Sequence, residues 1–347
     1  MIRMKSIFRF FSIILLLGIA FVWMANSCRL PYGYRYKKGH FPAEIRNMGA
    51  FNTRYDDYNA TAPSFWDDIP FCFSSNRYTR GGTFDIVFTI METDFDKTTG
   101  AFKMNRLSAD AEWLGRFRAL KDAMDTINTP ANEFGPYLTD AQNIDNGRGD
   151  YYTAFTLMYA SDSSGHLDIY YTDNYDRNIY ASPRPLDFLN SPADDAYPVF
   201  DSTRNHLYFC SNRAGTFDIY AVRTDPALSV NRLAETNRNT PERISVLSSS
   251  ANDKCPFIKG HLLVFASDRP GGYGGFDLYY SVWEHGHWSE PVNFGATINT
   301  AYDEYRPIIF SAKDYDNHVM IFSSNRPGGK GGFDLYYTGI AKDFPEP

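Results

Sequence analysis

The stretch Ser323-Ser324-Asn325-Arg326-Pro327-Gly328-Gly329-Lys330-Gly331-Gly332-Phe333-Asp334-Leu335-Tyr336-Tyr337 decides the fold of this chain. An apolar run at 318–322 leads into it, so two β-rich segments flank a turn rich in Gly, Pro and Asn, which predicts a β-hairpin. Related hairpins occur at 73–88, 159–171, 209–220 and 265–280. Because a hairpin cannot bury its apolar face alone, five copies predict a repeat architecture.

A second motif precedes each hairpin. It begins with an apolar residue and Asn or Ser, continues through an acidic or amide pair, and usually ends in Pro; the copies start at 51, 127, 189, 247 and 298. Four strands and their turns fit repeats of this length. The chain has 347 residues, of which 17% are aromatic, and this composition is typical of all-β proteins. We therefore predict an all-β fold, a five-bladed β-propeller.

The last repeat stops after its third strand, near residue 339. Residues 40–53 resemble the fourth strand and turn at 287–300 of the preceding repeat. We therefore expect 40–50 to complete the last blade, which closes the ring and removes exposed sheet edges. A sixth blade hidden in the long first repeat is the alternative.

The length of the first repeat has another explanation, an amphipathic helix at 109–125. Its apolar residues follow helical spacing; they are Trp113, Phe117, Leu120 and Met124. We expect this helix to pack on the edge of the propeller rather than to bind a partner.

The N-terminus resembles a bacterial lipoprotein signal. A basic start and the apolar run at 10–25 precede small residues and Cys28, although Asn26 departs from the usual pattern. The resemblance implies that residues 1–27 are removed and that Cys28 carries the lipid; an uncleaved membrane anchor is the alternative.

The rest of the chain divides into a tether at 28–39, a single propeller at 40–340 and a C-terminal tail at 341–347. The residues after Cys28 lack the acidic run that resembles a surface-export signal. We therefore expect a lipid-anchored protein of the outer membrane, on the periplasmic side rather than the cell surface.

The hairpin pattern Ser-Asn/Asp-Arg-x-Gly-Gly-x-Gly-Gly-Phe-Asp-Leu/Ile-Tyr resembles the WD-like propeller repeats of TolB-type periplasmic proteins. It is most similar to the version in Bacteroidota envelope lipoproteins. The resemblance covers nearly all of 40–340 and is strongest at 265–280 and 322–337. It implies an envelope propeller used for protein contacts, and it brings no catalytic residues.

The repeated polar residues are expected to meet at one end of the propeller, because the hairpin tips and the loops entering the inner strands share one face. Arginine offers a planar fork that suits carboxylates. We predict a structural belt between blades made of Arg77, Arg213, Arg269 and Arg326 with Asp57, Asp195, Asp253 and Glu304. In the second repeat Ser163 replaces the arginine and leaves Glu133 without a cation, so we hypothesise that this sector binds a ligand.

Aromatic residues accompany these loops and define a candidate binding face. Its members are Tyr55, Tyr58, Glu133, Phe134, Ser163, Tyr197, Tyr302 and Tyr305. Aromatic rings at a channel mouth suit stacking on sugars or gripping a peptide, but packing between blades explains them equally well.

Other functions find little support in the sequence. A net charge of −7 argues against nucleic acid. The histidines form no metal-binding HExxH motif, there is no P-loop or nucleotide fingerprint, and we expect no metal and no cofactor. Cys210 lies where other hairpins carry Ser or Ala, which indicates a core residue; a bridge to Cys255 is the alternative.

We therefore expect a non-catalytic scaffold that binds envelope proteins. The alternative is a glycan-binding or glycoside-hydrolase-like propeller that uses carboxylates and aromatic residues in its funnel.

Overall fold

The computed structural model describes residues 38–63, 68–96, 99, 101–107, 112–145, 151–174, 179–311 and 315–343. The predicted signal peptide, Cys28 and most of the tether lie outside the described residues. The chain divides into two units, one of which is the propeller, His40–Asp94 with Phe102–Pro347. In the described part of the other unit, the N–H of Asp96 donates to the carbonyl oxygen of Ala101 at 2.9 Å.

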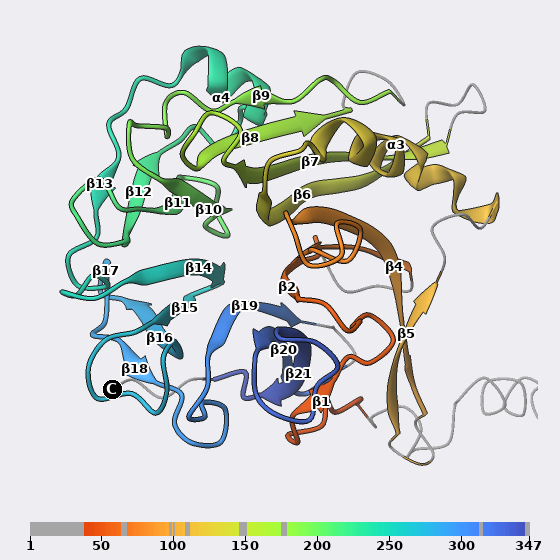
Figure 1. The fold of residues 1–347 in the computed structure, drawn as a ribbon. Coiled ribbons are helices and arrows are strands. Elements are labelled where there is room, and N and C mark those ends of the chain that lie inside the picture. The colour runs from red at the N-terminus through yellow and green to blue at the C-terminus, as the bar shows by residue number, and fades with distance from the viewer. Residues whose placement is uncertain are drawn as a thin grey trace, which may run out of the picture. The chain divides into compact units, whose positions relative to one another are not determined.

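The propeller unit contains five antiparallel sheets, which are the five blades (Figure 1). Blade 1 contains β2 (Asp57–Thr61), β3 (Asp68–Ser75), β4 (Asp85–Phe95) and β5 (Phe102–Leu107). Blade 2 contains β6 (Glu133–Asp145), β7 (Tyr151–Ser161), β8 (Asp168–Asp173) and β9 (Arg184–Pro185). Blade 3 contains β10 (Asp195–Phe200), β11 (His206–Ser211), β12 (Asp218–Arg223) and β13 (Glu242–Arg243).

Blade 4 differs in its outer edge, because two short strands pair with β16. It contains β14 (Asp253–Lys259), β15 (Leu262–Ser267), β16 (Asp277–Glu284), β17 (His287–Trp288) and β18 (Val292–Asn293). Blade 5 contains β19 (Glu304–Ser311), β20 (His318–Ser324), β21 (Asp334–Ile340) and β1 (Arg46–Asn47). The predicted five-bladed propeller is confirmed, and no sixth sheet occurs among the described residues.

The ring is closed as the sequence predicts. Arg46 and Asn47 of β1 pair with Tyr337 and Tyr336 of β21, which places the N-terminal strand at the outer edge of the last blade. Asn52 strengthens this junction, because its side chain bonds both the N–H and the carbonyl oxygen of Leu335 at 2.9 Å.

The innermost strand of every blade carries an irregularity in its pairing at the same place. One residue at each irregularity has a positive φ; these residues are Asn59, Gly135, Tyr197, Cys255 and Arg306. A bulge of this kind bends the strand and re-aims a side chain. Figure 1 shows the five innermost strands, β2, β6, β10, β14 and β19, around the centre of the ring.

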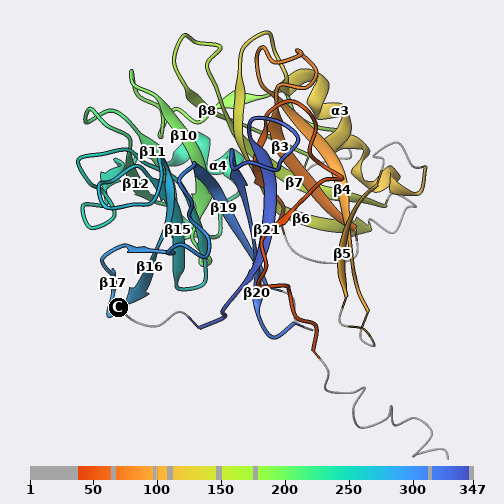
Figure 2. The same cartoon turned by 60° about the horizontal axis from the view of Figure 1, so that its bottom comes forward.

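The predicted helix is present. A 3₁₀ turn, η1 (Glu112–Phe117), leads into α3 (Arg118–Ile127), which buries Leu120 and Ala123 against residues of blades 1 and 2 such as Ile86 and Leu157. The structure adds a second helix, α4 (Val230–Thr236), whose N-cap Ser229 accepts a bond from Arg232 and whose Val230 and Leu233 are buried. Figure 2, turned from the first view, shows α3 beside β4 and β7.

Within the described part of the chain, no helix is both long and apolar enough to cross a membrane.

Candidate functional site

A repeated hydrogen-bonded unit, which we call the latch, fixes the start of the inner strand in four blades. In blade 1, Arg77 Nη2 donates to Asp57 Oδ1 at 2.5 Å and to the carbonyl oxygen of Phe51 at 2.6 Å. Ser75 donates to the same carboxylate oxygen at 2.5 Å. The other latches pair Arg213 with Asp195 at 2.5 Å, Arg269 with Asp253 at 2.6 Å, and Arg326 with Glu304 at 2.9 Å.

The arginine–carboxylate pair of each latch lies inside one blade rather than between blades, which corrects the expectation from the sequence; the second bond of each arginine goes to the segment that links the preceding blade. The reason is the strand pairing: Asp57 on β2 is the direct partner of Ser75 on β3, and Arg77 follows two residues later. The four latch carboxylates are fully buried, with side chains 0% exposed. They are therefore not accessible to a glycan in the funnel.

The contact between blades is made by the preceding residue of each motif. Asp56 Oδ1 accepts a bond from the N–H of Phe333 at 2.8 Å, which ties blade 1 to blade 5. The equivalent bonds run from Phe84 to Asn132, Leu167 to Asp194, Phe217 to Asn252 and Phe276 to Asp303. The two neighbouring polar residues of the motif thus have different partners, one within the blade and one in the adjacent blade.

Glu133 occupies the latch position of blade 2. Its carboxylate accepts bonds from Thr129 Oγ1 at 2.7 Å and Ser161 Oγ at 3.1 Å. Burial raises the pKa of Glu133 to about 7, although the hydrogen bonds from Thr129 and Ser161 act in the opposite direction. Ser163 is exposed, and its N–H donates to Ser161 Oγ at 3.3 Å. Glu133 is therefore a titratable group enclosed within the blade.

The predicted aromatic residues do not form one exposed face. Tyr58 and Phe134 come together, with ring centroids 6.2 Å apart, in a half-buried cluster that also contains Phe84 and Phe333. Tyr197 and Tyr305 are also neighbours, at 6.3 Å, but they are 6% and 9% exposed.

The remaining two tyrosines of the predicted face lie on loops. Arg54 donates to the Tyr55 hydroxyl at 2.7 Å, and Tyr302 is 46% exposed. None of the predicted residues lines the cavity that the structure places between blades 3 and 4.

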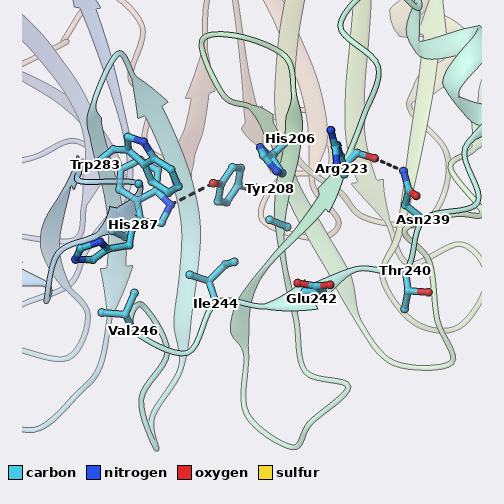
Figure 3. A pocket seen from close by; sticks show the side chains of 13 residues that line it. His206, Tyr208, Arg223, Asn239, Thr240, Glu242, Ile244, Val246, Trp283 and His287 are labelled. Atoms are coloured by element: carbon cyan, nitrogen blue, oxygen red, sulfur yellow. Dashed lines mark hydrogen bonds between the residues drawn. The ribbon is translucent and has the colours of Figure 1, made fainter.

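This cavity, which we call the tryptophan groove, has a volume of about 660 Å³ (Figure 3). Its lining consists of His206, Tyr208, Ala221, Arg223, Asn239, Thr240, Glu242, Ile244, Val246, Trp283, Gly286, His287 and Trp288.

The floor of the groove is one face of the outer strands of blade 3. Tyr208 on β11, Ala221 on β12 and Glu242 on β13 are direct partners across the sheet, so they form one row. His206 and Arg223 are partners in the next row on the same face. Because Ala221 carries only a methyl group, the middle of the floor is hollow.

The wall of the groove is the β16–β17 hairpin of blade 4. Trp283 and Trp288 are partners across it, with ring centroids 5.1 Å apart in an edge-to-face arrangement. Trp288 is held by a hydrogen bond from its Nε1 to the Tyr208 hydroxyl at 3.1 Å. Trp288 is 5% exposed, whereas Trp283 is 37% exposed and presents an open aromatic surface.

The groove adjoins a second cavity of about 280 Å³, since His206, Tyr208, Trp283 and Trp288 line both. Asp201 and His261 belong to this extension. The Asp201 carboxylate lies 3.1 Å from Nδ1 of His206, which orients the imidazole ring. Polar and aromatic groups therefore line both parts of the depression.

The sequence contains a signal for this groove that the motif comparison missed. The position of Ala221 is occupied by an aromatic residue in every other repeat; these residues are Phe88, Tyr171, Tyr280 and Tyr337. Extending the alignment one residue past the hairpin at 209–220 would have shown the missing ring.

The three cysteines within the described residues are buried free thiols, so Cys210 and Cys255 do not form a bridge. The described part of the chain contains no group of three or more His, Cys, Asp or Glu side chains placed to hold a metal ion.

No protein-family model matches the chain, and no curated protein resembles it significantly in sequence. Solved structures do resemble it. A thermostable family-43 glycoside hydrolase has a TM-score of 0.50 at 10% identity, over 84% of this chain and 96% of that chain. The α-L-arabinofuranosidase of Lactobacillus brevis has a TM-score of 0.48 at 10% identity, over 83% and 92%. The endo-arabinase of Bacteroides thetaiotaomicron has 0.46 at 12%, over 88% and 98%.

At such low identity the likeness establishes the β-propeller fold, and it transfers no residue and no substrate. It nevertheless overturns two expectations from the sequence. The non-catalytic scaffold and the absence of enzyme activity, which the sequence led us to expect, are corrected, because the solved structure that matches at a TM-score of 0.50 is a glycoside hydrolase. The glycan-directed alternative is the better supported of the two.

Proposed function

We propose that this protein acts on a glycan and that the tryptophan groove is where the glycan binds. One observation carries the proposal: Trp283 presents an open ring surface, 37% exposed, beside a floor that Ala221 leaves hollow. The C–H faces of a sugar ring stack on such an aromatic surface, and a concave, largely apolar site with a few polar groups is the usual form of a ligand site.

The polar lining of the groove suits sugar hydroxyls. Glu242 accepts hydrogen bonds, and Arg223 and His287 supply donors on other sides of the same cavity (Figure 3). A hydroxyl group both donates and accepts, so it can be bound by either kind of side chain. This combination favours a neutral or weakly charged glycan.

Hydrolysis requires two carboxyl groups flanking the scissile bond. The latch carboxylates are buried and bound to arginine, so they are unsuited to this role. Glu242 lines the groove and Asp201 lines its extension, and these are the two carboxyl groups that we propose to test.

The experiment is binding and hydrolysis on a panel of polysaccharides that includes arabinan, arabinoxylan and galactan. We expect the full-length protein to bind at least one of them and Trp283→Ala to weaken binding about tenfold or more, which corresponds to ~1.4 kcal/mol. Release of reducing ends, lost in Glu242→Gln with binding retained, would identify the hydrolytic reaction.

Ala221→Tyr provides the sharpest variant, since it restores the ring that the other blades carry and fills the groove. It should fold and fail to bind. Tyr273→Ala, which removes an exposed aromatic ring from a hairpin tip, is the matched control and should bind normally. Equal binding by the wild type, Trp283→Ala and Ala221→Tyr would refute the proposal.

We also propose that the chain is a TolB-type lipoprotein of the bacterial envelope, anchored through Cys28 on the periplasmic side of the outer membrane. The hairpin pattern and the signal-like N-terminus support this. Partner proteins in the envelope stay a prediction. Metabolic labelling with a fatty acid should mark the wild type and not Cys28→Ala, and protease should degrade the protein only after the outer membrane is opened.

A further inference from the structure

Arg306 places a positive charge on the axis of the propeller. It lies on β19 of blade 5 and is 1% exposed. Its Nη2 donates to the carbonyl oxygen of Pro136, on β6 of blade 2, at 3.1 Å. Blades 5 and 2 are not neighbours in the ring, so the side chain crosses the centre of the channel.

The residues around Arg306 come from the same bulge position of the other inner strands. The guanidinium carbon lies 5.4 Å from the ring centroid of Tyr197. Gly135 leaves space for that ring, because a Cβ at this position would clash with it. Asn59, on the neighbouring blade 1, is also fully buried.

Several polar atoms at this level have no hydrogen-bond partner among the described residues. They are Nε and Nη1 of Arg306 and both side-chain atoms of the Asn59 amide. Buried polar atoms are nearly always paired, so unpaired ones on two adjacent strands indicate a missing occupant.

Among the described residues the charge of Arg306 also has no counter-ion. No carboxylate of the described residues forms an ion pair with it, and the latch carboxylates are bound to their own arginines.

The titratable groups near Arg306 are neutral at pH 7. Burial raises the pKa of the Cys255 thiol to about 11, even though the Arg306 charge lowers it. Burial likewise raises the pKa of the Tyr197 and Tyr305 hydroxyls well above the usual value. An uncompensated buried charge is strongly unfavourable, so a negative group from solution would be favoured there.

We propose that the propeller axis binds a small inorganic anion, held by Nε and Nη1 of Arg306 and by the Asn59 amide. A cavity of about 250 Å³ lies at the far end of the inner strands, where residues of all five blades line it, among them Ala62, Thr139, Phe200, Ile258 and Ile309. Arg204 and Lys259 line this cavity together with one carboxylate, Asp201, so cationic groups outnumber anionic ones there, which favours the approach of anions.

The direct test is a crystal of the full-length protein soaked in sodium bromide, in which bromide is located by its anomalous scattering. We expect a peak within hydrogen-bond distance of the Arg306 guanidinium. A parallel soak in sodium sulfate distinguishes a site for halides from one for oxyanions. Well-defined water in place of either anion at this position would overturn the proposal.

A solution test measures the midpoint of thermal unfolding as bromide or sulfate replaces gluconate at constant ionic strength. A ligand that binds only the folded state raises this midpoint with the logarithm of its concentration. We expect the rise in the wild type, its loss in Arg306→Met, and a weaker rise in Asn59→Leu.

Arg232→Met on α4 removes an exposed arginine and should respond like the wild type. An anion response in Arg306→Met equal to that of the wild type would refute the assignment. If Arg306→Met does not fold, the presence or absence of the bromide peak beside Arg306 in the crystal decides whether the proposal holds.

Discussion

The latch end of the propeller and the tryptophan groove differ in how they relate to the repeat: the latches follow it, and the groove departs from it. In four latches the same arginine–carboxylate contact recurs at 2.5 to 2.9 Å, and the bond between blades recurs at all five junctions. The groove exists because one blade departs from the repeat at Ala221. Residues that recur from blade to blade hold the ring together, whereas the groove lies where one blade differs.

The junction between blades 3 and 4 departs from the repeat in a second way. At the other four junctions an asparagine side chain bonds both the N–H and the carbonyl oxygen of a strand in the preceding blade; these residues are Asn52, Asn128, Asn190 and Asn299. The equivalent residue here is Ser248, which instead donates to Ile244 in its own loop. The junction that carries the groove is therefore tied less tightly.

The largest effect is expected from breaking a latch. Arg269→Met leaves the carboxylate of Asp253 buried without a cation and should lower the free energy of unfolding by about 3–5 kcal/mol. Urea denaturation measures this loss. The double variant Arg269→Met/Asp253→Leu should recover most of it, and a loss below about 1 kcal/mol in the single variant would contradict the role of the latch.

A smaller effect is expected at Glu133, and it depends on pH. The ordinary pKa of a glutamate carboxyl is 4.5 and burial raises it to about 7 in the fold, so the folded state binds the extra proton between these values. Stability should therefore fall as pH rises from about 4.5 to 7 and stay low above pH 7.

Glu133→Gln removes this dependence and should raise stability at pH 8 by up to about 2 kcal/mol, with little change near pH 4.5. Urea unfolding at several pH values tests it. Ser163→Arg should also flatten the profile by supplying the missing latch cation. Parallel pH profiles for wild type and Glu133→Gln would show the assignment to be wrong.

On the groove side, Trp288→Phe keeps an aromatic ring and removes the bond to the Tyr208 hydroxyl. We expect a loss of about 1 kcal/mol in thermal or urea unfolding. Tyr208→Phe should give a similar loss, and the double variant should add little to either. Additive losses would indicate that the two side chains are not coupled.

The smallest effect on stability is expected for Ala221→Tyr. The new ring enters a cavity of about 660 Å³ and displaces water rather than packed side chains. The free energy of unfolding should change by no more than about 0.5 kcal/mol. A large destabilisation would mean that the hollow floor is part of the packing and not a free site.

The fold could be predicted from the sequence because its signals are local and repeated. The hairpin at 322–337 and its siblings fixed the number of blades, and residues 40–50 contained the closing strand. The helix α4 was missed because it is short and lies between repeats.

The sites were less predictable, because they depend on which side of a strand each residue faces. Asp56 and Asp57 are adjacent in sequence, yet one bonds the neighbouring blade and the other its own latch, since successive side chains alternate. The groove depends on the absence of an aromatic side chain at Ala221, and a comparison of shared residues does not detect such an absence. The axial position of Arg306 could not be predicted from the sequence, because it follows from the bulges of all five inner strands lying together at the axis.

The closing strand β1 determines how the propeller responds to mechanical tension. Its pairing with β21 involves two residues, Arg46 and Asn47, and β1 is the first strand of the described chain. A pull on the amino-terminal side therefore loads the bonds of Phe41 and Pro42 to Asn317 and Gly339 first, and then this two-residue pairing. Once it parts, blade 5 loses its outer edge, so the element that closes the ring is also the place where force would open it.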